Sequence, residues 1–184
     1  MTEKNCAITE MWTENGQREL RIRKGGSADA AILAEILVAS FGTAFADIIS
    51  RKTIERCADK ENCRNMFAAI LKSGNGQFYI AEANGKPCGE LYWCDGEEMA
   101  EAAEIVAIHS LPENWGSGVG KAMLETALGE MKRAGKTAVY LWAFKENKRG
   151  RRFYEKNGFA ADGMERVSEF DGAMEVRYVY QFEG

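Results

Sequence analysis

The spacing of apolar residues predicts a strand and two helices in the first part of the chain. Leu20 to Arg23 alternates apolar and polar side chains as a half-buried strand does, and Gly25-Gly26 ends it. Ser27 then begins a helix whose apolar face comprises Ile32, Leu33, Ile36, Leu37 and Phe41. A second helix is predicted from Thr53 to Lys72 by the helical spacing of Cys63, Met66, Phe67, Ile70 and Leu71.

Three strands are predicted in the middle of the chain. Phe78 to Ala81 and Cys88 to Cys94 are β-rich runs on either side of Asn84-Gly85. That dipeptide tolerates the positive φ angles of a tight hairpin, so we expect the two runs to pair in antiparallel fashion. Ala103 to Ser110 is a short apolar run, which is typical of a strand covered on both faces.

Helices and strands alternate in the rest of the chain. A helix that stops at Gly135 is marked by Val119, Met123, Ala127, Leu128 and Met131. Thr137 to Phe144 is β-branched and aromatic, which predicts a buried strand, and a helix follows from about Asn147 to Lys156. Two strands joined at Asp171-Gly172 finish the chain. The order β-α-α-β-β-β-α-β-α-β-β predicts an α/β or α+β fold, in which helices flank one mixed sheet with one core.

Length and composition limit the class of protein. The 184 residues favour a single domain, which we place at 19–184, with the polar and aperiodic residues 1–18 as a tail or accessory strand. The net charge of −4 argues against a surface built for nucleic acid or an anionic membrane, and for a cationic partner. Five cysteines without a C-x-x-C pair indicate a reduced, cytoplasmic protein. No run approaches the ~20 apolar residues that a membrane helix needs.

The strongest local signal is a glycine-rich segment between a predicted strand and a predicted helix. In Trp115-Gly116-Ser117-Gly118-Val119-Gly120-Lys121 the glycines let backbone N–H groups approach a ligand closely, and the helix N-terminus adds partial positive charge. A phosphate or pyrophosphate is therefore the expected ligand. The dinucleotide-binding pattern G-x-G-x-x-G and the nucleotide-triphosphate pattern G-x-x-x-x-G-K-[ST] both fail to match the segment. A turn made only for tight packing of strand against helix is the alternative.

Three segments, in order along the chain, resemble motifs of the GNAT superfamily of acetyl-CoA-dependent N-acetyltransferases. The loop from Trp115 to Gly120 is similar to the [QR]-x-x-G-x-[GA] signature, with Trp115 in place of Gln or Arg. Glu104 to Pro112 resembles the E-[LI]-x-x-[LI]-[YF]-V-x-P strand. Asn147 to Phe159 resembles the N-x-x-A-x-x-F-Y-E-K-x-G-F helix, with Gly150 in place of Ala. The resemblance implies the GNAT fold, in which helices flank a mixed, mostly antiparallel sheet.

The resemblance also implies where acetyl-CoA would bind. The backbone of Ile108 and Ser110 would pair with the pantetheine arm like an added strand, with His109 between them, and Asn147 would hydrogen-bond the same arm. Arg151 belongs to a basic cluster that could meet the ribose phosphate of CoA or nucleic acid, or form a solvated helix face. The cluster comprises Lys145, Lys148, Arg149, Arg151, Arg152 and Lys156. The pyrophosphate would be held by backbone amides of Trp115, Gly116, Ser117, Gly118, Val119, Gly120 and Lys121.

Acyl transfer to an amine requires a base, an oxyanion site and an acid. An amine with a pKa near ~10 is mostly protonated at neutral pH, and Glu104 is the candidate base. The alternative for Glu104 is an exposed strand charge in the acidic run that begins at Glu97. Backbone N–H groups near Ile108 to Ser110 would stabilise the oxyanion. Tyr154 stands where the motif places an acid that protonates the leaving thiolate, and its alternative is a core tyrosine.

These residues favour an N-acetyltransferase that moves an acetyl group from acetyl-CoA to a primary amine, by direct attack in a ternary complex. The expected acceptor is a small cationic molecule, with no nucleic acid or membrane partner and with a homodimer as one option. A non-catalytic acyl-CoA-binding or regulatory module and an acetyltransferase of protein N-termini are the alternatives. His109 also permits a Cys-His acyl-enzyme route, but no cysteine lies in a recognisable nucleophile turn, so we expect a packed strand residue. No H-x-x-x-H or C-x-x-C pattern indicates a metal site.

Overall fold

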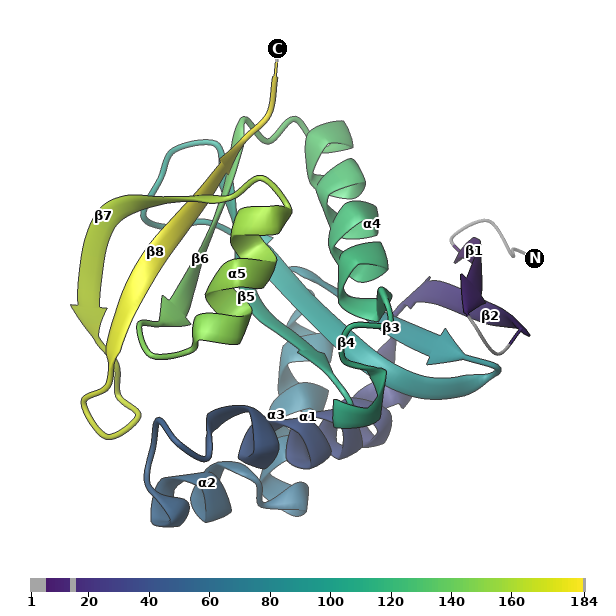
Figure 1. Ribbon diagram of the computed structural model, residues 1–184, viewed down its shortest axis with the longest axis horizontal. Coiled ribbons are helices and arrows are strands. Elements are labelled where there is room, and N and C mark those ends of the chain that lie inside the picture. Colours follow the sequence, from purple (N-terminus) through teal and green to yellow (C-terminus); the bar gives the residue numbers. More distant parts are fainter. Residues whose placement is uncertain (1–5, 14–15, 184) are drawn as a thin grey trace.

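The computed structural model describes residues 6–13 and 16–183, with side chains from residue 19 onward, and within these residues eight strands form one sheet. The strand order is β1-β2-β3-β4-β5-β6-β8-β7 (Figure 1). Neighbouring strands are antiparallel except for β5 and β6, which are parallel. The strands are β1 (Cys6–Thr13), β2 (Gly16–Lys24), β3 (Gln77–Ala83), β4 (Lys86–Asp95), β5 (Ala102–Ser110), β6 (Ala138–Phe144), β7 (Ala160–Val167) and β8 (Met174–Gln181).

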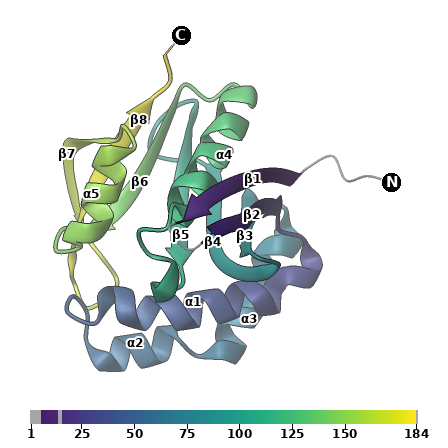
Figure 2. The same ribbon diagram turned by 45° about the vertical axis from the view of Figure 1, so that its right-hand side comes forward.

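Helices cover both faces of this sheet. Met123, Leu124 and Met131 of α4 are fully buried in a core shared with the central strands, whereas α1 and α3 pack together against Phe78 and Ile80 on the opposite face. Figure 2 shows α1, α2 and α3 as a group separate from α4 and α5. The helices are α1 (Ala30–Phe45), α2 (Arg51–Cys57), α3 (Lys60–Ser73), α4 (Val119–Arg133) and α5 (Lys148–Lys156), with 3-10 turns η1 (Ser27–Asp29) and η2 (Pro112–Asn114).

The parallel pairing of β5 with β6 is short. Ala102 to Ile105 pair with Ala138 to Leu141, and the second half of β5 has no partner on that side although β6 continues to Phe144. A bulge also interrupts the pairing of β5 with β4, because Trp93 pairs with Ile105 and Tyr92 with Ala107, which leaves Val106 as the extra residue. The unpaired, kinked end of β5 is therefore open to a ligand.

The predicted order of elements is confirmed, with one helix divided. The stretch expected as a single helix from Thr53 to Lys72 forms α2 and α3, because Asp59 accepts a hydrogen bond from the Asn62 amide and begins a new helix. The predicted mixed, mostly antiparallel sheet is also confirmed. Of the tail or accessory strand expected at 1–18, residues 1–5 and 14–15 lie outside the described residues, and Cys6–Thr13 is the edge strand β1.

Within the described residues, one helical segment is apolar enough, by length and composition alone, to cross a membrane. It runs from Ser27 to Phe45 and lies near the N-terminus. Such a segment is weak evidence by itself, since a core helix passes the same test. Here Leu33, Ala34 and Ile36 are buried against α3 and the sheet.

Candidate active site

A cavity of about 880 Å³ opens at the unpaired end of β5. It lies within the size range of small-molecule sites, roughly 300–1,000 Å³. Four segments form its walls: the end of α1, the end of β5, the loop that leads into α4, and α5 with its preceding loop. The lining residues are Ser40, Ala44, Phe45, Ile108, His109, Ser110, Asn114, Trp115, Gly116, Gly118, Gly120, Lys121, Asn147, Lys148, Arg149, Gly150, Arg152, Phe153, Tyr154, Lys156 and Asn157.

The loop before α4 takes a shape that needs glycine. Gly116 and Gly118 have φ angles of +75° and +88°, in the left-handed region that side chains avoid. Gly118 caps α4, so the first amides of the helix, from Val119 onward, have no acceptor within the helix. The loop thus combines exposed N–H groups with the positive end of a helix, an arrangement suited to an anion.

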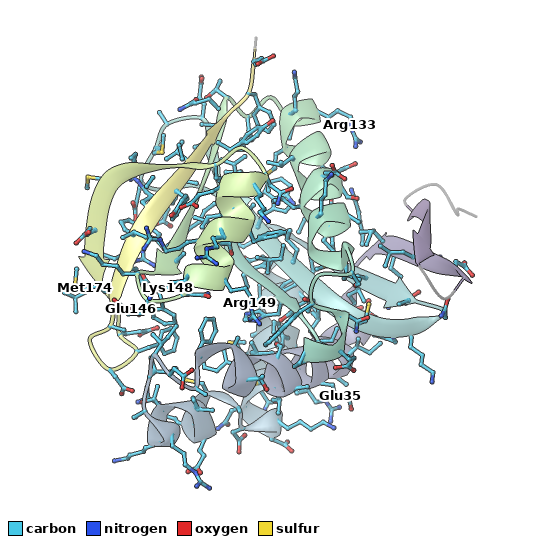
Figure 3. All side chains as sticks on the ribbon, in the orientation of Figure 1. Glu35, Arg133, Glu146, Lys148, Arg149 and Met174 are labelled. Atoms are coloured by element: carbon cyan, nitrogen blue, oxygen red, sulfur yellow. The ribbon has the colours of Figure 1, made fainter. Side chains whose placement is uncertain are left out.

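The charged side chains around the cavity are all basic. They are Lys121, Lys148, Arg149, Arg152 and Lys156, and no aspartate or glutamate lines the cavity within the described residues. Arg149, labelled in Figure 3 together with Lys148, lies over the Trp115 ring, with Cζ 3.2 Å from the ring centroid. Burial lowers the pKa of Arg149 from its usual value. The charges of the lining therefore favour an anionic ligand.

Trp115 and Asn147 are both held by hydrogen bonds to the backbone. The Trp115 Nε1–H donates to the carbonyl oxygen of Ser110 at 3.0 Å, which brings the indole across the end of β5. Asn147 Oδ1 accepts from the Gly150 amide at 3.0 Å and caps α5. A Cβ on residue 150 would lie 2.5 Å from Asn147 Nδ2, so glycine at this position leaves room for the cap.

Tyr154 lines the cavity from α5 and is packed among aromatic rings. Its ring centroid lies 5.4 Å from that of Phe153, 6.0 Å from that of Phe159 and 6.1 Å from that of Tyr178. Burial raises the pKa of the Tyr154 phenol above its usual value of ~10. The hydroxyl is therefore protonated at neutral pH.

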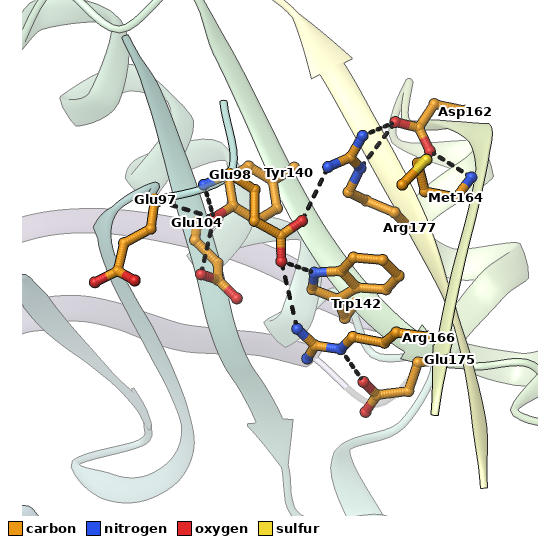
Figure 4. A network of polar contacts seen from close by, with 10 residues as sticks. All are labelled: Glu97, Glu98, Glu104, Tyr140, Trp142, Asp162, Met164, Arg166, Glu175 and Arg177. Atoms are coloured by element: carbon orange, nitrogen blue, oxygen red, sulfur yellow. Dashed lines mark hydrogen bonds and ion pairs between the residues drawn. The ribbon is translucent and has the colours of Figure 1, made fainter. Parts of the chain in front are cut away.

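Glu104 lies on β5 but outside the cavity lining, in a network of polar contacts (Figure 4). The Tyr140 hydroxyl donates to Glu104 Oε2 at 3.0 Å and accepts from the amides of Glu97 and Glu98. The Glu98 carboxylate is in turn bound by Arg177 at 2.9 Å. Burial raises the pKa of Glu104, and the hydrogen bond from Tyr140 opposes that rise. A carboxylate with a raised pKa is a better proton acceptor than an ordinary one.

His109 lines the cavity beside an aromatic cluster at the end of α1. Its ring centroid lies 6.3 Å from those of Phe41 and Phe45, and Phe45 also packs edge-on against Phe144. Burial lowers the pKa of His109 to about 4, so its imidazole is neutral at pH 7. No group of three or more His, Cys, Asp or Glu residues able to hold a metal ion is found in the described part of the chain.

The structure brings most of the predicted residues together at one cavity but leaves four outside its lining. These four are Glu104, Ser117, Val119 and Arg151. Val119 is buried in the core, and the Ser117 hydroxyl donates to the Asn114 carbonyl. Arg151 donates instead to the Tyr178 hydroxyl and the Lys145 carbonyl, whereas its neighbour Arg149 reaches the cavity. Sequence reasoning missed seven lining residues: Ser40, Ala44, Phe45, Asn114, Gly150, Phe153 and Asn157.

Residues 42–159 match the family model described as the acetyltransferase (GNAT) family. The chain belongs to the GNAT acetyltransferase family. The matched segment contains β5, the loop before α4 and α5, together with Ala44 and Phe45 at the end of α1, so it includes every lining residue of the cavity except Ser40.

Relatives of this GNAT protein include proteins named as N-acetyltransferases. It is 35% identical over 104 residues to an uncharacterised N-acetyltransferase of Methanocaldococcus jannaschii, a match that covers 54% of the chain and spans only 46% of the relative. It is 28% identical over 166 residues to a spermidine N(1)-acetyltransferase of Thermoplasma acidophilum, covering 86% of the chain and 98% of the relative. The fold matches that of the PaiA N-acetyltransferase of Thermoplasma acidophilum, solved with coenzyme A, with a TM-score of 0.72, 24% identity and coverage of 89% and 99%.

Proposed function

We propose that this GNAT protein transfers an acetyl group from acetyl-CoA to a primary amine on a small cationic molecule. The observation that carries the proposal is the cavity itself, which is lined by a glycine-shaped anion loop, five cations and Tyr154. The coenzyme A in the structure of the PaiA relative supports the donor. The spermidine N(1)-acetyltransferase of Thermoplasma acidophilum supports a cationic amine as acceptor.

The donor would be held mainly by backbone groups. The amides of Gly116 to Lys121 are suited to the pyrophosphate, and the unpaired end of β5, from Ile108 to Ser110, to the amide groups of the pantetheine arm. Arg149 and Arg152 both line the cavity, whereas Arg151 does not. We assign Arg149, which lies over Trp115 beside the anion loop, to a phosphate of the donor in place of Arg151.

The reaction then needs three contributions from the chain. Glu104 would take the proton of the amine, through water because it lies outside the cavity lining, and its raised pKa suits that task. Backbone N–H groups near Ile108 to Ser110 would stabilise the negative charge on the carbonyl oxygen during attack. Tyr154 would give its phenolic proton to the sulfur as the carbon–sulfur bond breaks.

An amine panel tests the proposal. Purified protein is incubated with acetyl-CoA and, in turn, with polyamines, amino acids, arylalkylamines and peptides with a free N-terminus, and release of the free CoA thiol is followed. We expect the fastest thiol release with polyamines or another small cationic amine. Preference for the peptides would instead support an acetyltransferase of protein N-termini. Binding of CoA without thiol release for any amine would support a non-catalytic acyl-CoA-binding module.

A further inference from the structure

Glu90 is a buried carboxyl group that the proposed mechanism does not use. It lies in β4, its side chain is 1% exposed, and neither of its carboxylate oxygens has a hydrogen-bond partner in the structure. An ionised carboxylate without a partner is costly in such a place. Burial accordingly raises the pKa of Glu90 to about 8, so the group is mostly protonated at pH 7.

The side chain directly across the strand pair from Glu90 is His109. The two residues are register partners in β4 and β5, so their side chains lie on the same face of the sheet with Cβ atoms about 5 Å apart. His109 also lines the cavity, whereas Glu90 does not. His109 is thus the register partner of Glu90 that also borders the cavity, and no hydrogen bond joins the two side chains in the structure.

Among the described residues, the other groups around Glu90 are apolar, weakly acidic or already paired. Across β3 the register partner of Glu90 is Ile80, and the titratable group that faces it from α3 is the thiol of Cys63, whose pKa is raised by burial. The one carboxylate of α1, Glu35, is exposed and paired with Lys60. Burial alone accounts for the raised pKa of Glu90.

We propose that His109 and Glu90 form a second proton-accepting pair for acyl transfer, in which His109 takes the proton of the acceptor amine at the cavity wall and Glu90 is the positioning residue behind it. The proton leaves the ammonium nitrogen for an imidazole nitrogen, the amine keeps the electron pair with which it attacks the thioester, and the Glu90 carboxylate then faces the imidazolium. The proton later passes to solvent. This inference rests on the proposed function, in which Glu104 is the other acceptor.

The pair works only when Glu90 is ionised. Below pH 7 Glu90 carries a proton and leaves His109 a weak base in an apolar setting, with a pKa near 4. As the pH rises through 8, the carboxylate forms and favours the charged imidazolium across from it. The contribution of the pair is thus absent at low pH and grows between pH 7 and 9.

An NMR titration tests the pair without reference to activity. His109 is the one histidine of the 184-residue chain, so its ring signals need no assignment. We expect the parent protein to show a step in the His109 signals between pH 7 and 9, and Glu90→Gln, which mimics the neutral carboxyl group, to lack it. Glu104→Gln should keep the step. A parent without a step, or a step that persists in Glu90→Gln, would overturn the pairing; Glu90→Met replaces Glu90→Gln if that variant does not fold.

Kinetics then test the role in the reaction. With the best amine, the ratio of parent to Glu90→Gln turnover should grow from near unity at pH 6 to about 10-fold at pH 9, because a positioned base contributes ~10²–10⁴-fold and Glu104 remains. The double variant Glu90→Gln/His109→Gln should be no slower than His109→Gln alone, since Glu90 acts through His109. An equal loss at every pH would mark Glu90 as structural and refute the role. If no amine is acetylated, the proposed function fails while the NMR result still decides the pairing.

Discussion

The guanidinium group of Arg149 lies over the indole of Trp115, joining the first turn of α5 to the loop before α4. The same indole donates its Nε1–H to the Ser110 carbonyl. That carbonyl is one of the backbone groups proposed to pair with the pantetheine arm. The Trp115 indole is therefore hydrogen-bonded to a backbone carbonyl group, that of Ser110, which the donor would also use.

Replacing Trp115 by Phe should strengthen the binding of CoA. Phenylalanine keeps an aromatic ring but frees the Ser110 carbonyl, and a single hydrogen bond has a net worth of about 0.5–1.5 kcal/mol, which corresponds to roughly 2- to 12-fold in the dissociation constant. Isothermal titration calorimetry with CoA measures the change. Trp142→Phe is the matched control, because its Nε1–H donates to Glu98 away from the cavity, and it should leave CoA affinity as in the parent. Weaker binding in Trp115→Phe would show that the indole contacts the donor.

Gly116→Ala should weaken CoA binding, whereas Gly74→Ala should not. Both glycines have left-handed φ angles, +75° and +72°, and a Cβ at either position would meet no atom within 4 Å. Each substitution should therefore cost about 1–2 kcal/mol of stability through backbone strain. Only Gly116 lines the cavity, so a loss of affinity beyond about 5-fold is expected for that variant alone. The unfolding temperatures of the two variants are measured with and without CoA. If CoA raised both temperatures by the same amount, the loop would not belong to the CoA-binding site.

Tyr154→Phe should lower kcat by ~10²–10⁴-fold while leaving stability and acetyl-CoA affinity near those of the parent, since the hydroxyl acts as the thiolate leaves. Tyr178→Phe is the control, because its hydroxyl donates to Glu155 and accepts from Arg151 away from the cavity lining. That variant should lose stability, by ~1–3 kcal/mol, and keep its turnover. Single-turnover thiol release separates the two. Parental kcat in a folded Tyr154→Phe protein, with chemistry rate-limiting, would exclude the acid role.

Tyr140→Phe should move the acidic limb of the pH–rate profile to higher pH. The Tyr140 hydroxyl stabilises the ionised form of Glu104, so its removal raises the pKa of Glu104 further. The base is active when ionised, and turnover should therefore fall most at low pH and recover as the pH rises. Thiol release measured from pH 5 to 8 tests this, with Tyr140→Phe in the Glu104→Gln background as control, where the shift should vanish. An unshifted limb would mean that Glu104 does not titrate in the reaction.

Local patterns were sufficient to predict most elements because each depends on neighbours in the chain. The hairpin at Asn84-Gly85 forms as expected, with both residues at positive φ. The break between α2 and α3 was missed since the apolar spacing from Thr53 onward suits one continuous helix. The local capping bond of Asp59 overrides that spacing.

The site required information that no local pattern contains. Arg149 and Arg151 are equivalent in a list of basic residues, and only the docking of α5 against β8 sends one to the cavity and the other to Tyr178. The register that sets His109 opposite Glu90 is fixed by pairing between strands, with a bulge at Val106 three residues before His109. Phe45 reaches the cavity through the packing of α1 on the sheet. Each of these placements depends on contacts between elements that are distant in the sequence.

The all-cationic wall of the cavity lies in a chain whose formal net charge is −4, and this contrast determines how a polyanion finds the protein. At physiological ionic strength the Debye length is about 8 Å, so an approaching phosphate group feels the nearby lysines and arginines and little of the distant carboxylates. At low ionic strength the field of the whole molecule extends further and opposes that attraction. Lowering the salt concentration should therefore increase the association rate of a phosphorylated donor. The increase should be smaller than the five clustered cations would cause in a chain without net negative charge. The protein would steer its ligand by local rather than net charge.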